Sequence, residues 1–107
     1  MFRADAEMTD HAVDLCQQLL RIDTTNPPGN ERPAADLCAS ELAAAGLDPV
    51  VIESAPTRAN VVARLAGSGQ KPPLLLTAHL DVVEADPSKW RYPPFSGEIA
   101  EGCLWGR

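Results

Sequence analysis

The sequence predicts an α/β protein in which helices pack on a mixed sheet. Three observations support this fold class: two stretches with apolar residues at helical spacing, two short runs rich in β-branched residues, and one longer apolar run at residues 74–83. Because the longer run is continuous and polar residues end it, we expect a central strand that is buried on both faces. The 107 residues are enough for one small domain with a modest core.

Two helices are expected in the first half of the chain. The first is predicted to run from a cap at Asp10 to about Arg21, because apolar residues recur there every three or four positions. The second is predicted to begin at a cap at Asn30, with Pro33 tolerated in its first turn. Gly46 supplies the residue type that most often ends a helix.

Four short strands are expected beside the central one. Residues 49–53 and 60–65 are rich in valine and isoleucine and are bounded by turn formers. Their connection is too short for a parallel crossover, so they should pair antiparallel if they are adjacent. Residues 96–100 and 103–105 flank Glu101 and Gly102, a pattern typical of a β-hairpin.

The candidate functional residues are His79 and Asp81, at the end of the predicted central strand. Alternate side chains of a strand point to the same side, so both can face the region where open α/β sheets bind ligands. A neutral imidazole binds zinc through one ring nitrogen, and a carboxylate that accepts a hydrogen bond from the other nitrogen orients the ring. The same pair would also suit a nucleophilic triad, and it could equally be a hydrogen-bonded turn. His11 is expected to be a solvated surface residue.

Composition excludes several classes of partner. The net charge of −6 repels phosphate backbones, so we expect no nucleic-acid partner. No apolar stretch is long enough to span a membrane and no basic amphipathic stretch suggests a membrane surface, so no membrane partner is expected. Residues 1–8 alternate charges and lack the apolar segment of a secretory signal. We therefore expect a cytoplasmic protein.

The three cysteines do not predict a disulfide framework or a zinc knuckle. Their number is odd and no two are spaced as C-x-x-C. Cys16 and Cys38 fall on apolar helix faces, where packing is the expected role, and Cys103 lies in the predicted hairpin with no assigned chemistry.

The ordered set of motifs resembles the zinc peptidase and deacylase family of acetylornithine deacetylase, succinyl-diaminopimelate desuccinylase, aminoacylase and glutamate carboxypeptidase. The resemblance covers nearly the whole chain and depends on four segments: TNPPGNE at 25–31, HLDVV at 79–83, Trp90 with PPFSG at 93–97, and EGCLWGR at 101–107. The fold it implies is the N-terminal part of a zinc-exopeptidase-like α/β/α sandwich. One departure is Glu101, where relatives commonly have aspartate.

The resemblance also implies the site and the chemistry. His79 would ligate one of two zinc ions, and Asp81 would be the catalytic-site carboxylate that orients it. Cobalt and manganese remain open as alternatives, because His and carboxylate ligands suit several metals. The intact enzyme would hydrolyse amide bonds of N-acyl amino acids or of peptides with a free carboxylate, and the full-length protein would be a candidate homodimer.

Residues 1–107 are expected to be a truncated portion of the catalytic domain. The family's metal-bridging aspartate, its glutamate pair, its remaining ligands and its lid domain would all come after Arg107. The alternative is a non-catalytic α/β domain of the same shape that serves binding or assembly. A hydrolase that uses a serine or cysteine nucleophile is disfavoured, because no such residue has the flanking pattern of a nucleophile elbow.

We therefore predict that the purified chain 1–107 neither holds a metal pair nor hydrolyses N-acyl amino acids. It supplies only one side chain that would coordinate the metal directly, whereas a catalytic zinc needs at least three protein ligands. Amine release from N-acyl amino acids, measured with added zinc, should equal that of a zinc-only blank. Turnover above the blank would contradict the prediction.

Overall fold

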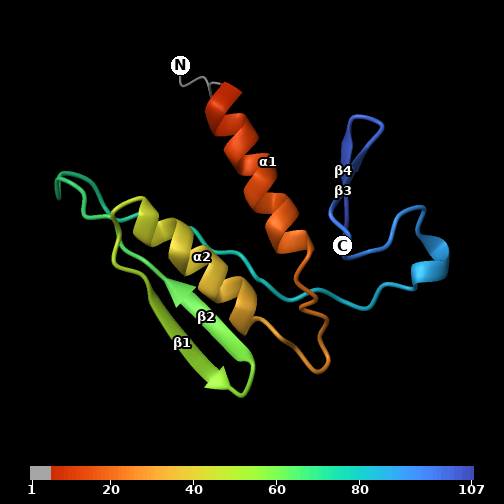
Figure 1. Cartoon of the computed structure of the whole chain (residues 1–107). Helices are drawn as coiled ribbons and strands as arrows, with labels where there is room; N and C mark the ends of the chain where they lie inside the picture. The colour runs from red at the N-terminus through yellow and green to blue at the C-terminus, as the bar shows by residue number, and fades with distance from the viewer. Residues whose placement is uncertain (1–5) are drawn as a thin grey trace. The chain divides into compact units, whose positions relative to one another are not determined.

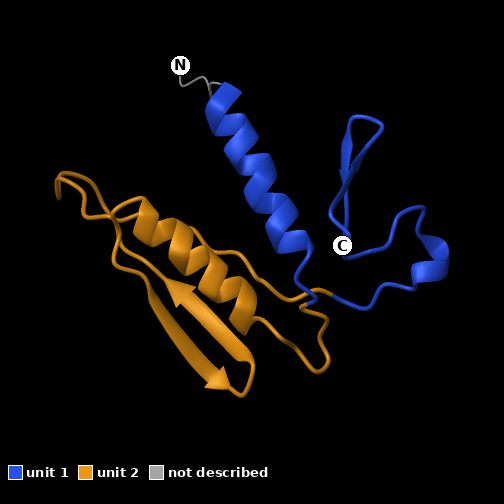
Figure 2. Cartoon of the chain, viewed as in Figure 1, with its two compact units in different colours: residues 1–23, 83–107 blue, residues 24–82 orange. Residues whose placement is uncertain are grey.

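The structure is a computed structural model that describes residues 6–107. The chain divides into two compact units, shown in different colours in Figure 2. Unit 1 comprises Met1–Asp23 and Val83–Arg107, and unit 2 comprises Thr24–Val82. The mixture of helices and strands confirms the α/β class. No helix of the described part of the chain is both long and apolar enough to cross a membrane.

Unit 2 consists of helix α2, Arg32–Ala44, followed by strands β1, Val50–Ala55, and β2, Arg58–Val62. The strands form an antiparallel hairpin in which Val50 is opposite Val62, as predicted from their short connection. The helix lies along one side of the hairpin (Figure 1). The residues buried where the helix meets the strands have small side chains. They are Ala34 and Ala35 on the helix and Ala59 on β2. Small side chains let the helix backbone approach the strands closely.

The ends of α2 follow local rules. At the C-terminus Gly46 has φ +81°, its N–H donates to the carbonyl of Ala43 at 2.9 Å, and the N–H of Leu47 donates to the carbonyl of Leu42 at 3.0 Å. These bonds form a Schellman motif, which confirms the predicted stop. At the N-terminus the cap position is Glu31, which makes no side-chain cap hydrogen bond, so the prediction of Asn30 as the cap residue is wrong.

Unit 1 contains helix α1, Ala6–Leu20, and a second hairpin. The described helix begins before Asp10, so that residue lies inside α1 and the predicted cap is wrong. No residue of α1 is buried, and Cys16 is exposed, so the packing role predicted for this thiol is also wrong. Helical spacing alone does not bury a face, because burial needs a second surface opposite it.

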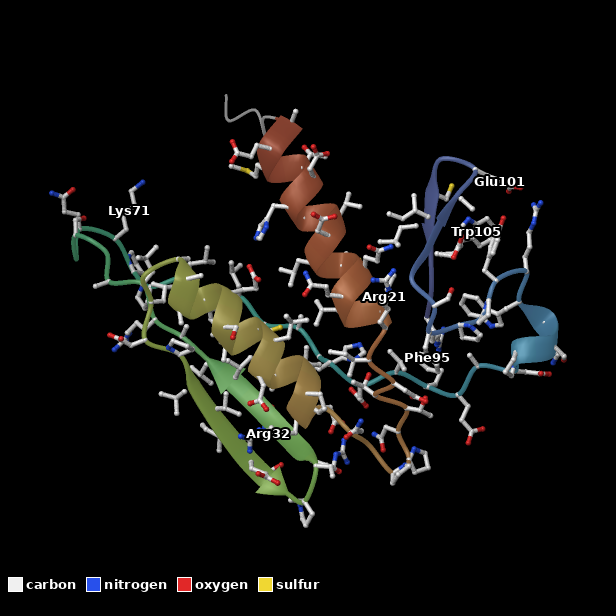
Figure 3. The ribbon with its side chains drawn as sticks, viewed as in Figure 1. Arg21, Arg32, Lys71, Phe95, Glu101 and Trp105 are labelled. Carbon is white, nitrogen blue, oxygen red and sulfur yellow. The ribbon has the colours of Figure 1, made fainter. Side chains whose placement is uncertain are left out.

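The second hairpin has the predicted form. Strands β3, Glu98–Ala100, and β4, Cys103–Trp105, pair antiparallel around Glu101 and Gly102, both with positive φ, as in a type I′ turn. Figure 3 shows Glu101 at the tip and Trp105 below it. The Trp105 ring packs at 5.2 Å from that of Tyr92, and its indole N–H donates to the carbonyl of Ala100 at 3.0 Å.

The predicted central strand at residues 74–83 is not formed. Leu74, Leu75 and Leu76 are 82%, 85% and 83% exposed, and only Val82 makes a bridge, a parallel one with Thr25. The expected mixed sheet is likewise replaced, in the described residues, by two separate antiparallel pairs. The physical reason is that a strand needs a neighbour for its backbone groups, and no described strand pairs with this segment.

We predict that Gly46→Ala destabilises unit 2 by about 1 kcal/mol, because an L-residue at positive φ is strained. A new Cβ meets no atom at this position, so the backbone effect is isolated. Gly67→Ala is the matched control, since Gly67 also faces open space and has no positive φ. Urea unfolding followed by circular dichroism should separate the two variants; equal midpoints would contradict the assignment.

Candidate functional site

The site in unit 2 begins with two segments that lie side by side, residues 24–26 and residues 80–82. The N–H of Asn26 donates to the carbonyl of Val82 at 2.8 Å, and the N–H of Val82 donates to the carbonyl of Thr24 at 3.2 Å. The buried Thr24 hydroxyl donates to the carbonyl of Leu80 at 2.7 Å. These three bonds hold the proline-containing loop against the segment that carries the candidate residues.

His79 and Asp81 are brought together as the sequence analysis expected. The imidazole Nδ1 lies 2.8 Å from the backbone oxygen of Asp81 and 3.0 Å from its carboxylate Oδ1. Both oxygens are acceptors, so Nδ1 must carry the proton in the neutral ring. Its Nε2 then has a free lone pair, and the His79 side chain is 83% exposed. The ring is therefore oriented with its basic nitrogen available to a ligand.

Asp81 has a second partner that the sequence analysis did not assign. Its Oδ2 accepts a hydrogen bond from the Asn26 side-chain amide at 3.0 Å. The bond from Asn26, followed by the one from His79, lowers the pKa of the Asp81 carboxyl below its ordinary value of 3.8. The carboxylate is therefore ionised at neutral pH. The only sequence signal for Asn26 was its place in the TNPPGNE segment.

An ion pair between a buried carboxylate and a partly exposed arginine supports the same loop. The Glu31 side chain is only 7% exposed, and its carboxylate accepts two bonds from Arg58, at 2.7 Å from Nη2 and 3.2 Å from Nε. This pairing lowers the pKa of Glu31 below its ordinary 4.5. Gly29 leaves room for it, because a Cβ there would lie 2.7 Å from Arg58 Nε, and its φ of +90° also favours glycine.

The start of α2 carries a more exposed arginine, Arg32 (Figure 3). It bonds to the Asp36 carboxylate at 2.9 Å and to Glu53 of β1 at 2.7 Å. All three side chains of this group are more than 40% exposed, so water screens their charges and they contribute little to stability.

Within the described residues, His79 has the geometry of a single metal ligand, but no complete donor set surrounds it. A histidine whose Nδ1–H is held by a carboxylate and whose Nε2 is free is the usual arrangement of a metal-binding imidazole. Residues 6–107 contain no group of three or more His, Cys, Asp and Glu side chains that could enclose a metal ion. The other histidine of the described residues, His11, lies on α1 of unit 1, and Cys103 is exposed.

Comparison with known proteins shows that the relatives of this chain include deacylases. It is 37% identical over 108 residues to the succinyl-diaminopimelate desuccinylase of Methylobacterium radiotolerans, a match that covers 97% of the chain. It is 36% identical over 107 residues to the enzyme of the same name from Methylocella silvestris. A shorter match, 54% over 35 residues and 33% of the chain, is to the N-fatty-acyl-amino acid synthase/hydrolase PM20D1 of Xenopus tropicalis.

The chain belongs to the deacylase family that contains succinyl-diaminopimelate desuccinylase. This confirms the resemblance that the ordered motifs suggested. The chain spans about a quarter of the length of the relatives it matches, 26% of each desuccinylase, and 7% of the Xenopus protein. A scan of protein-family models gives no match.

We predict that Arg58→Met lowers the melting temperature of unit 2 by several degrees at pH 7 and by less at pH 3. Because the folded-state pKa of Glu31 is lowered, the pair stabilises the fold above pH 4.5, and this stabilisation is lost as the pH falls through the folded-state pKa. At pH 7 the variant leaves a buried carboxylate without a partner, whereas at pH 3 the carboxyl can be neutral.

Arg32→Met is the matched control for this measurement, because its partners are exposed and the expected loss is much smaller at both pH values. Thermal unfolding of each variant by circular dichroism provides the comparison. A cost for Arg58→Met that does not change between pH 3 and pH 7 would contradict the assigned ion pair.

Proposed function

We propose that residues 1–107 form the N-terminal portion of the catalytic domain of a metal-dependent amide hydrolase. In this proposal His79 is a metal ligand through Nε2, and Asp81 is the carboxylate that orients it. The observation that carries the proposal is the pair of acceptors around Nδ1, at 2.8 and 3.0 Å, which directs the free lone pair of the imidazole outward. Family membership supports the reaction class.

The residues of this chain would act by orientation and charge. Asp81 accepts the Nδ1–H, which fixes one tautomer and makes Nε2 a better electron-pair donor. Its lowered pKa means that it stays an acceptor throughout the neutral range. The exposure of His79 leaves space for further ligands from other residues.

Zinc is the proposed metal, with cobalt and manganese as alternatives, and two ions per complete catalytic domain. When bound, it would supply a Lewis acid that polarises the scissile carbonyl and lowers the pKa of a water molecule. The proposed substrates are N-acyl amino acids or peptides with a free carboxylate. This class is supported by the names of the relatives, which describe removal of a succinyl group from diaminopimelate and hydrolysis of N-fatty-acyl amino acids. We further propose that the full-length protein is a homodimer and is cytoplasmic.

The test uses a full-length protein that carries this sequence. His79→Ala should lower both the bound zinc, measured by atomic emission after dialysis, and the hydrolysis of N-succinyl amino acids, by about 10-fold or more, since even outer partners of metal ligands cost 10–100-fold. His11→Ala, the chain's other histidine, is the control and should retain both.

If His79→Ala keeps the zinc content and the activity of the parent, His79 is not a ligand and the metal-site proposal is wrong. If the parent itself has neither zinc nor activity, the alternative of a non-catalytic α/β domain for binding or assembly replaces the proposal.

A further inference from the structure

We propose that Asn26 is a positioning residue, which holds one carboxylate oxygen of Asp81 so that the other stays on Nδ1 of His79. The inference deepens and rests on the proposed function, because it assigns the group that holds one of the two acceptors that favour the Nδ1–H tautomer of the proposed ligand. It concerns the metal-free imidazole, however, so it can be tested without any metal or substrate.

The geometry divides the two carboxylate oxygens of Asp81 between two donors, and the backbone oxygen of Asp81 is a second acceptor 2.8 Å from Nδ1 of His79. Oδ1 lies 3.0 Å from Nδ1 of His79, and Oδ2 lies 3.0 Å from Nδ2 of Asn26. Without the second bond, the carboxylate could rotate about its Cβ–Cγ axis and water could compete for it, since Asp81 is 34% exposed. With the bond in place, rotation breaks two hydrogen bonds at once, and the orientation that faces the imidazole is favoured.

The backbone of Asn26 is itself fixed relative to the Asp81 segment. The Asn26 N–H donates to the carbonyl of Val82, the residue after Asp81, at 2.8 Å. On the other side of the loop, the N–H of Gly29 donates to the carbonyl of Thr25 at 2.9 Å, and Glu31 is bound to Arg58. The short side chain of Asn26 therefore reaches Asp81 from an anchored position, so little conformational freedom is lost when the bond forms.

The chemical nature of the donor matters for the role. An amide donates a hydrogen bond without carrying a charge, so Asp81 keeps its full negative charge for the imidazole. A lysine or arginine at this position would compete with His79 as a cationic partner. An aspartate of the same shape would remove the donor and add repulsion between two carboxylates.

The experiment measures the tautomer of His79 by NMR in the metal-free chain labelled with ¹⁵N-histidine, at a pH where the ring-nitrogen shifts show the neutral form. In Asn26→Ala and Asn26→Asp the ratio of Nδ1–H to Nε2–H tautomer should fall by about threefold to tenfold, the range expected when one hydrogen bond is lost. The matched control is Asn60→Ala on β2, an exposed asparagine, which should keep the parent ratio.

A second comparison separates positioning from a general effect on the loop. In an Asp81→Asn background, the further change Asn26→Ala should leave the His79 tautomer ratio unchanged, because Asn26 acts through the carboxylate. A role limited to loop structure would lower the melting temperature of Asn26→Ala and Asn26→Asp without moving this ratio. Such a result, or a parent ratio in both Asn26 variants, would overturn the inference.

The result of this tautomer experiment can be distinguished from the result of the zinc-binding test of the proposed function. If His79→Ala leaves the zinc content of the full-length protein unchanged, the metal-site proposal ends, but the tautomer measurement, and hence the positioning role of Asn26, still stands. Conversely, an unchanged tautomer ratio removes the role of Asn26 and leaves the ligand role of His79 intact.

Discussion

The arrangement of the site depends on the backbone pairing between residues 24–26 and Val82. Two N–H donations, at 2.8 and 3.2 Å, join segments that are more than fifty positions apart, and the buried Thr24 hydroxyl adds a third contact to Leu80. Neither segment belongs to a helix or to one of the named strands, so this pairing places the amide of Asn26 beside the carboxylate of Asp81. The orientation of the His79 ring then follows from the fixed carboxylate.

Further contacts support this loop. The Glu31–Arg58 pair connects the end of the loop to β2, and glycine suits position 29 because its φ is +90° and a Cβ would come within 2.7 Å of Nε of Arg58. The Thr57 hydroxyl also donates to the carbonyl of Gly29 at 3.1 Å. The sequence order of these residues explains why TNPPGNE is informative as a unit: Asn26 reaches the site, while Gly29 and Glu31 attach the loop to the hairpin.

Features set by local chemistry could be predicted from the sequence, and features set by distant partners could not. Gly46 ends α2 and Glu101 with Gly102 closes a hairpin, because a positive φ is a property of one or two residues. The pairing of His79 with Asp81 was foreseen from a spacing of two. The hydrogen bond from Asn26 to Asp81 joins residues that are 55 positions apart, and no periodicity in the sequence indicates such a contact. The expected strand at 74–83 failed for a related reason, because a sequence run cannot show whether a neighbouring strand is present to pair with it.

The central claim is that the outward nitrogen of His79 is the metal-binding atom. The most direct measurement is a crystal structure of a full-length protein carrying this sequence, with anomalous diffraction recorded at the zinc edge. The account predicts an anomalous peak about 2.0–2.1 Å from Nε2 of His79, with Nδ1 still bonded to Asp81. A peak on Nδ1, or zinc bound in the protein at a site that does not include His79, would contradict it.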